Sequence, residues 1–159
     1  MQKILEILEK DCQVTPEQIA VMLNRDLDEV REKIQALRDN GIIVGSKLLI
    51  DWDQADSERV TAFIELRCTP QHGEGFDNIA RRIYQYEHVK TVWLMSGSFD
   101  IGLIIEGKTM KEVALFVAEK LAPMDAVVST GTHFVLKTYK DSGIIYQKPQ
   151  KDERSIITL

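Results

Sequence analysis

The sequence contains few cysteines and histidines, and they do not cluster. Its two cysteines, Cys12 and Cys68, have no CxxC spacing, and its three histidines, His72, His88 and His133, are equally scattered. A disulfide scaffold needs more cysteines than this, and a zinc site needs ligands at close, regular spacing. We therefore expect two free, partly buried thiols in a reducing compartment, and neither a metal nor a cofactor.

Long apolar runs are also missing. The longest, such as residues 103–105, are far too short to cross a bilayer, and the first residues lead into an amphipathic pattern instead of a signal peptide. We expect a cytoplasmic protein that does not contact membranes. Hydrophobic residues make up 44% of the chain and charged residues 28%, and 159 residues suffice for one ordinary domain or two small ones.

The net charge of −5 is unevenly distributed. Residues 1–56 carry 7 lysines and arginines against 12 aspartates and glutamates, whereas residues 57–159 carry 13 of each kind. All of the excess acidity therefore lies in the first third of the chain.

Three helices are nevertheless predicted in the first third. A short amphipathic helix opens the chain and breaks near residues 11–13. The second helix begins at Thr15, which heads a complete capping-box pattern. The third spans residues 27–39, with Asp26 as its N-cap and Gly41 in the left-handed position that ends it.

Two short strands, residues 42–44 and 47–50, are expected around a turn at Gly45. Three helices followed by such a hairpin form a winged helix-turn-helix, in which the third helix presents its outer face to the DNA major groove. Residues 1–50 are assigned to this domain. The alternative is a three-helix unit with no nucleic-acid role.

The third helix also supports that alternative. Asp28, Glu32 and Asp39 lie on its outward face, where carboxylates repel phosphates. Acidic side chains accept hydrogen bonds from cytosine, but they normally do so within a basic surround. If the helix binds DNA, we expect contacts from Gln35 on the outward face and from the neighbouring basic residues Arg25, Arg31, Lys33, Arg38 and Lys47.

A linker is expected at residues 51–58, and beyond it the pattern of elements repeats. Strand, helix and strand are followed by the same three elements, so residues 59–140 have the order βαββαβ. That order predicts a ferredoxin-like domain for ligand binding and dimerisation, with one antiparallel sheet and both helices on one face. The fold class is α+β, and residues 141–159 are expected to form a C-terminal tail.

The sheet of this domain has one face that no helix covers. Phe63, Trp93 and Phe134 are predicted to lie on that face, and an aromatic open face in a globular protein usually indicates self-association. The last strand is expected over residues 126–139, with a bulge at Gly131.

The middle of the domain is a predicted hairpin over residues 92–106. Only Ser96, Gly97 and Ser98 separate its two strand-forming runs, and Gly97 takes a positive φ without a Cβ penalty. Asp100 follows close to the turn. It either stabilises the turn or forms one end of a small polar site, in which backbone N–H groups hold a carboxylate and Asp100 pairs with an ammonium group.

Together these features resemble the Lrp/AsnC family of leucine-responsive, or feast/famine, transcription factors. The resemblance covers residues 4–139 and includes the helix-turn-helix, the acidic linker and G-x-x-D-x-x-L at residues 97–103. It implies a homodimer built on the βαββαβ sheets, often assembled further to tetramers or octamers. It also implies an amino-acid effector bound near the glycine turn at subunit contacts. Gly97 and Asp100 match the family's effector region, and with Ser96 and Ser98 they form the predicted effector site.

We predict a transcriptional regulator that binds double-stranded promoter DNA and responds to an amino acid or a related metabolite. One alternative is an effector-binding oligomeric module whose degenerate, acidic helix-turn-helix does not bind DNA. The other is an enzyme similar to siroheme decarboxylases, with His72, His88, Arg81 and Arg82 as its candidate residues. These residues do not converge in the sequence, and no nucleophile, phosphate-loop or metal-ligand pattern indicates catalysis, so we expect no enzymatic activity.

Overall fold

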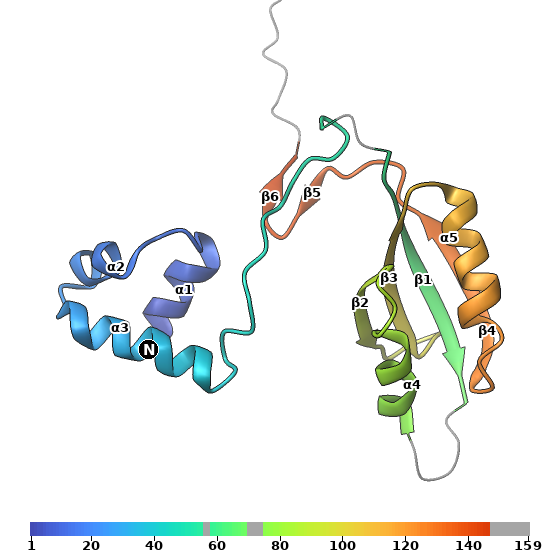
Figure 1. Cartoon of the computed structure of the whole chain (residues 1–159), viewed down its shortest axis with the longest axis horizontal. Coiled ribbons are helices and arrows are strands. Elements are labelled where there is room, and N and C mark those ends of the chain that lie inside the picture. Colours follow the sequence, from blue (N-terminus) through green and yellow to red (C-terminus); the bar gives the residue numbers. More distant parts are fainter. Residues whose placement is uncertain (56–57, 70–74, 147–159) are drawn as a thin grey trace, which may run out of the picture. The chain divides into compact units, whose positions relative to one another are not determined.

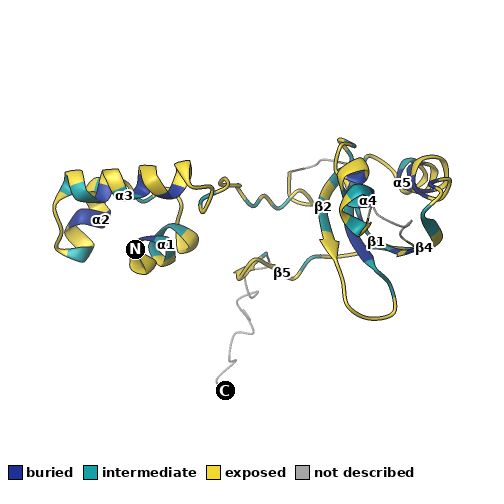
Figure 2. Ribbon diagram, turned by 90° about the horizontal axis from the view of Figure 1, so that it is seen from below, coloured by how far each residue is buried: buried dark blue, intermediate teal, exposed yellow. Residues whose placement is uncertain are grey.

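The computed structural model describes residues 1–55, 58–69 and 75–146, and the chain divides into two compact units after Ile50. We call residues 1–50 the head and the described residues from 51 onward the sheet domain. Buried residues, dark blue in Figure 2, gather separately within each unit, so each has its own core. In the described part of the chain, every helix is too short or too polar to cross a membrane.

The head consists of the three predicted helices, α1 (Gln2–Lys10), α2 (Pro16–Leu23) and α3 (Leu27–Asp39) (Figure 1). The caps that were predicted from the sequence are present. The Thr15 side chain accepts a hydrogen bond from the Gln18 N–H and completes a capping box. The Asp26 carboxylate accepts from two N–H groups of the first turn of α3. The head's core is formed by Ile4, Ile19, Ala20, Val30, Ile34 and Leu37.

The two strands expected after α3 are not formed. Gly41 does take a left-handed φ of 68°, and the N–H groups of Ile42 and Ile43 both donate to the Leu37 carbonyl oxygen. Residues 44–50 then continue as an extended segment without a ladder. A two-stranded hairpin is marginal unless its apolar side chains are covered, and here Val44 is 93% exposed.

The sheet domain has the predicted βαββαβ order. Its elements are β1 (Val60–Cys68), α4 (Gly75–Ile83), β2 (Val89–Leu94), β3 (Ile101–Gly107), α5 (Met110–Phe116) with a π-helical turn η1 (Val117–Leu121), and β4 (Val127–Phe134). The four strands lie in the order β2-β3-β1-β4, and all neighbours are antiparallel. This is the ferredoxin-like arrangement expected from the sequence (Figure 1).

Both helices pack on the same face of the sheet. The strands contribute alternate residues to this core, such as Ala62, Ile64 and Leu66 from β1, because side chains one apart point to opposite faces. Ile79 from α4 and Val113 from α5 meet them there. Within residues 1–55, 58–69 and 75–146, no helix packs on the other face of the sheet, which agrees with the prediction.

The residues on this open face follow from the strand register. One row across the sheet is Trp93, Gly102, Glu65 and Gly131, and the next includes Phe63 and His133. Phe63 and Trp93 therefore lie on the open face as predicted. The prediction for Phe134 was wrong: it pairs with Ala62 and packs against the helix-side core. A shift of one residue along a strand reverses the face.

The last strand is shorter than predicted, and its irregularity lies elsewhere. β4 ends at Phe134, and Gly131 pairs regularly with Glu65. The register instead shifts where Arg67 and Cys68 of β1 pair with Ser129 and Val127, so the extra residue is Val128 of β4.

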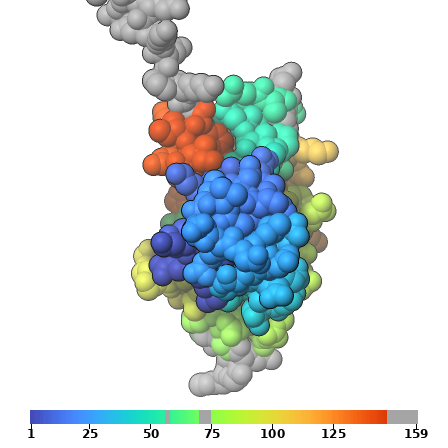
Figure 3. All heavy atoms as spheres, turned by 90° about the vertical axis from the view of Figure 1, so that its left-hand side faces the viewer, coloured from blue at the N-terminus to red at the C-terminus, as the bar shows by residue number. Residues whose placement is uncertain are grey.

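A small hairpin that was not predicted follows β4, formed by β5 (Lys140–Asp141) and β6 (Ile144–Ile145). Its two-residue turn has positive φ at Ser142 and Gly143, which suits the right-handed twist of a hairpin. The hairpin, orange in Figures 1 and 3, lies beside the linker turn near Asp51. The beginning of the expected tail is thus ordered, and residues 147–159 lie outside the described residues.

Within the sheet domain, Trp52 of the linker is connected to strand β3 through Arg59. Its ring lies under the guanidinium group of Arg59, 4.5 Å from the ring centroid, and Arg59 forms a 3.2 Å ion pair with Glu106 at the end of β3. Cation–π contacts of this kind are weak but directional. The segment that leaves the head is therefore joined to the end of a central strand.

Candidate functional site

The loop between β2 and β3 is held to β1 by Asp100. Its Oδ2 atom accepts a hydrogen bond from the Cys68 N–H at 2.8 Å, and its own N–H donates to the Leu66 carbonyl at 2.9 Å. Its carbonyl oxygen accepts from the Met95 N–H at 2.8 Å. Asp100 thus closes the ends of three strands and does not only cap its own turn. Its Oδ1 atom makes no hydrogen bond with a described residue, so half of the carboxylate remains available.

The turn itself is open to solvent. Ser96, Gly97 and Ser98 are all exposed, and Gly97 has a φ of 144°, which residues with a Cβ rarely adopt. The structure adds a residue that the sequence did not indicate: Arg67 on β1 donates from Nε to the Ser98 carbonyl oxygen at 2.8 Å. Only the antiparallel pairing of β1 with β3 brings Arg67 here, and that pairing joins residues more than 30 positions apart.

The loop region therefore combines a cation with an anion. The guanidinium group of Arg67 has no carboxylate partner among the described residues, and four of its five N–H donors remain after the contact with Ser98. The Asp100 carboxylate reaches the next residue of β1, Cys68. Opposite charges at neighbouring positions suit a ligand that carries both an acid and an ammonium group.

An apolar surface adjoins this charged region. The Phe99 ring packs edge-on against Phe63, with centroids 5.8 Å apart. The Phe63 ring in turn covers Gly102, where an added Cβ would approach it to 3.2 Å, and Met95 lies beside the same glycine. The loop is thus continuous with the open face of the sheet.

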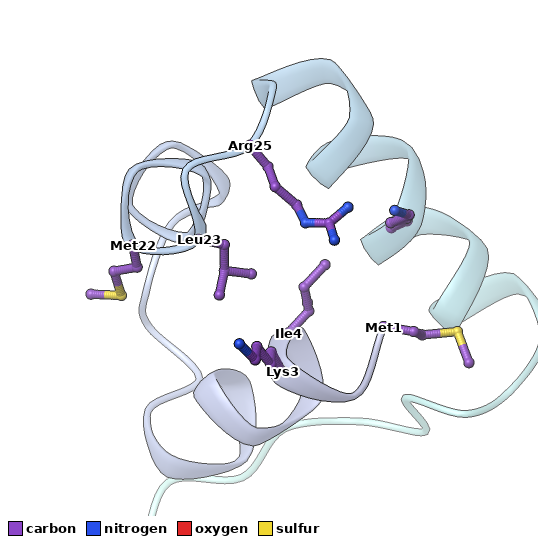
Figure 4. A pocket seen from close by; sticks show the side chains of 7 residues that line it. Met1, Lys3, Ile4, Met22, Leu23 and Arg25 are labelled. Atoms are coloured by element: carbon purple, nitrogen blue, oxygen red, sulfur yellow. The ribbon is translucent and has the colours of Figure 1, made fainter.

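The candidate DNA-binding residues on one edge of α3 share a single carboxylate. The Glu29 Oε1 atom accepts from Arg25 Nη1 at 2.8 Å and also forms an ion pair with Lys33. The ammonium group of Lys33 and, to a smaller extent, Arg25 hold the pKa of Glu29 below its ordinary value. Both cations also line a pocket of about 240 Å³ between the helices (Figure 4), which Lys3 borders from α1.

On the other edge of α3, Arg31 lies between two carboxylates. Its Nη2 atom is 2.5 Å from Glu17 Oε1 on α2, and its Nη1 atom is 3.8 Å from Asp28 Oδ1. Hydrogen bonds from the backbone and from Arg31 lower the pKa of Glu17. Glu17 therefore stays ionised at neutral pH and pairs with a cation that the sequence assigned to DNA.

The remaining candidate DNA-binding residues differ in their surroundings. Gln35 donates from Nε2 to Asp39 Oδ1 at 2.8 Å, so its amide is already in use. Arg38 is exposed and forms no ion pair with any residue of the described segments. Lys47 lies on the extended segment that replaces the predicted wing. The six residues are thus not brought together at one point.

His88 and Arg81, two of the residues considered for an enzyme, have separate partners in the described part of the chain. His88 lies against the Phe116 ring, with Nε2 3.3 Å from Glu112 Oε1. The Arg81 guanidinium donates to the neighbouring Asn78 side chain, and His72 lies outside the described residues. Among the residues that are described, no three metal-ligating side chains gather at one place.

The two cysteines occupy contrasting environments. Cys12 is exposed, so the prediction that it is partly buried was wrong, whereas Cys68 is buried. Burial and, second to it, the neighbouring Asp100 charge raise the pKa of Cys68 to about 11. Because the thiolate is the reactive form, Cys68 is inert at neutral pH.

We expect native protein at pH 8 to release one equivalent of chromophore rapidly from a thiol-reactive disulfide reagent, from Cys12 alone. A Cys12→Ser variant should react slowly, and denaturant should restore one reactive thiol. Two equally fast thiols in native wild-type protein would contradict the burial of Cys68.

Comparisons with known proteins agree with this architecture. Residues 61–145 match the model of the Lrp/AsnC ligand binding domain. The chain is 41% identical over 157 residues to the HTH-type transcriptional regulator YugG of Bacillus subtilis, covering 98% of this chain and 95% of that protein.

Two solved structures show the same fold at lower sequence identity. The E. coli AsnC structure has a TM-score of 0.65 at 17% identity and covers 85% of this chain and 89% of its own. The regulator NMB0573 of Neisseria meningitidis, solved as an L-Met complex, has a TM-score of 0.71 at 20% identity. The match covers 87% of this chain and 89% of that one. With the match to YugG over nearly the full length of both chains, these findings show that the protein belongs to the Lrp/AsnC family of HTH-type transcriptional regulators.

Proposed function

We propose that the protein is a homodimeric regulator that binds promoter DNA through its head and an amino acid at the loop between β2 and β3. The observation that carries this proposal is that Arg67 and Asp100 both contact the ends of one loop, Arg67 through the Ser98 carbonyl and Asp100 through the Cys68 N–H. This loop adjoins the open sheet face, in a chain whose other unit is a three-helix head. Its relatives are transcriptional regulators, and the described residues show no convergent catalytic group. We place its action in the cytoplasm, where promoter DNA is found.

The DNA contact of the head depends on basic residues at the edges of α3. Arg38 has no carboxylate partner among the described residues, so its charge is available to a phosphate without a competing ion pair. The outward face between the edges carries Asp28 and Glu32, both exposed. Binding by this head is therefore expected to be of modest affinity and strongly salt-dependent.

We expect wild-type protein to retard a fragment of its own promoter region at low salt, with affinity falling steeply between about 50 and 200 mM salt. Arg38→Gln should weaken binding and reduce the slope of log K against log salt by about 0.9, the value for one lost phosphate contact. Lys10→Gln, which removes an exposed charge at the end of α1, is the matched control. An unaltered slope in the Arg38 variant would exclude this residue as a phosphate contact.

The effector in this proposal is an amino acid with an apolar side chain. Its carboxylate meets the free donors of Arg67 and the backbone at Ser96, Gly97 and Ser98, and its ammonium group meets Oδ1 of Asp100. The adjoining surface of Phe63, Phe99 and Met95 suits an apolar side chain. The L-Met complex of the Neisseria regulator supports this ligand class.

We expect calorimetric titration with the twenty common L-amino acids to identify one or a few apolar ligands. Arg67→Met keeps the length of the side chain but removes its charge, and it should weaken binding at least about tenfold, because a hydrogen bond to a charged group contributes roughly 1.5–3 kcal/mol. Arg82→Met on α4 is the control. Equal affinity for the decarboxylated amine would show that Arg67 does not hold the ligand's carboxylate.

The open sheet face is the proposed dimer contact. Phe63 and Ile104 are half-buried there although no helix covers them, and Trp93 is 46% exposed. We propose that a second copy of the same face covers it. The face carries apolar side chains together with the Glu65–His133 pair, with 3.4 Å between Glu65 Oε1 and His133 Nε2. An identical face offers both apolar and polar groups in return.

We expect Trp93→Glu to convert the dimer to a monomer in light scattering coupled to size-exclusion chromatography, since it places a charge within the proposed apolar contact. Leu136→Glu changes a residue that is 87% exposed beyond the end of β4 and should leave the mass unchanged. A Trp93 variant that keeps the dimeric mass would place the contact on another surface.

A further inference from the structure

Three of the five basic side chains that the sequence assigned to DNA already form ion pairs within the head. Arg25 and Lys33 share Glu29, and Arg31 is held by Glu17. These contacts span two edges of α3 and connect it with α2. The head thus supplies its own acidic partners at the positions where phosphates would otherwise bind.

The pairs are exposed enough to exchange partners. The side chains of Arg25 and Glu29 are 48% and 42% exposed, and those of Arg31 and Glu17 are 53% and 52% exposed. Exposed ion pairs contribute little to stability because water screens them. Arginine binds phosphate in the same bidentate manner as it binds carboxylate, so a DNA phosphate competes for the same donors.

We propose that Glu17 and Glu29 act as internal competitors of DNA phosphates and thereby set the affinity of the head for DNA. This inference rests on the proposed DNA binding. When DNA binds, Arg31 leaves Glu17, and Arg25 or Lys33 leaves Glu29, and each released carboxylate takes up a solvent cation. The gain from counterion release at these contacts is then largely offset.

Two other carboxylates of the head differ from this pair and serve as references. Glu6 on α1 is exposed and forms no ion pair with a described residue. Glu32 is exposed on the outward face of α3 and is likewise unpaired among the described residues. Neutralising Glu6 changes only the net charge, whereas neutralising Glu32 removes a direct repulsion without releasing a cation.

The test measures DNA affinity across salt concentration for wild type and for Glu17→Gln, Glu29→Gln, Glu32→Gln and Glu6→Gln in the full-length protein. Gln keeps the shape of the side chain and removes its charge. We expect Glu17→Gln and Glu29→Gln each to tighten binding several-fold and to steepen the slope of log K against log salt by up to about 0.9 per released cation. Glu6→Gln should leave the slope unchanged, and the slope for Glu32→Gln should change less than for the paired residues.

The outcomes separate this inference from the proposed function. If wild type binds DNA but the slopes of the Glu17 and Glu29 variants equal that of wild type or of the Glu6 variant, the internal competition is refuted and DNA binding stands. If only the two paired variants bind, the inference is supported in its strongest form. If neither wild type nor any variant binds at low salt, both ideas fail. Circular dichroism melting of each variant verifies that the head remains folded.

Discussion

The covering of only one sheet face by α4 and α5 is the constraint from which the rest of the sheet domain follows. Ile64, Leu103 and their neighbours are fully buried beneath the helices, so the fold of the monomer is complete on that side. On the other side the same strands present Phe63 and Trp93 without cover. In the proposed dimer, a second copy covers this face, so the sheet determines the oligomeric state.

The position of the effector loop follows from the same sheet. Asp100 ties the loop to β1 through the Cys68 N–H, and Phe99, the residue before it, packs on Phe63 at the centre of the open face. A ligand held between Arg67 and Asp100 would thus contact a loop whose next side chain belongs to the proposed dimer contact. In the proposed regulator, the effector site and the dimer contact share one contiguous group of side chains, so a bound amino acid acts directly on the arrangement of subunits.

Local signals in the sequence were enough to predict most helices and strands. They did not predict the contacts between residues that are far apart in the chain. The capping box at Thr15 and the N-cap at Asp26 fix two helix starts through contacts three residues away, and both are present as predicted. The wing strands failed because strand propensity requires a covering layer that the head does not supply. Phe134 was placed on the wrong face because the register of β4 depends on β1, and Arg67 was missed because its contact with the loop is made across two strands.

The acidity of the head makes DNA binding depend on assembly in the proposed dimer. A head in which Arg25, Lys33 and Arg31 already form ion pairs gains less from contacts of these residues with DNA. In the proposed dimer, two such heads bind nearby half-sites. Once the first head is bound, binding of the second is intramolecular, and the effective concentration is roughly millimolar for a short flexible linker. If each head has a low affinity for DNA, binding requires both heads of a dimer. A head of high affinity would bind DNA without a partner, so its binding would not depend on assembly. In the proposed regulator, a change of assembly produced at the loop near Asp100 is thus amplified at the DNA, and the carboxylates of Glu17 and Glu29 are the residues that make this amplification possible.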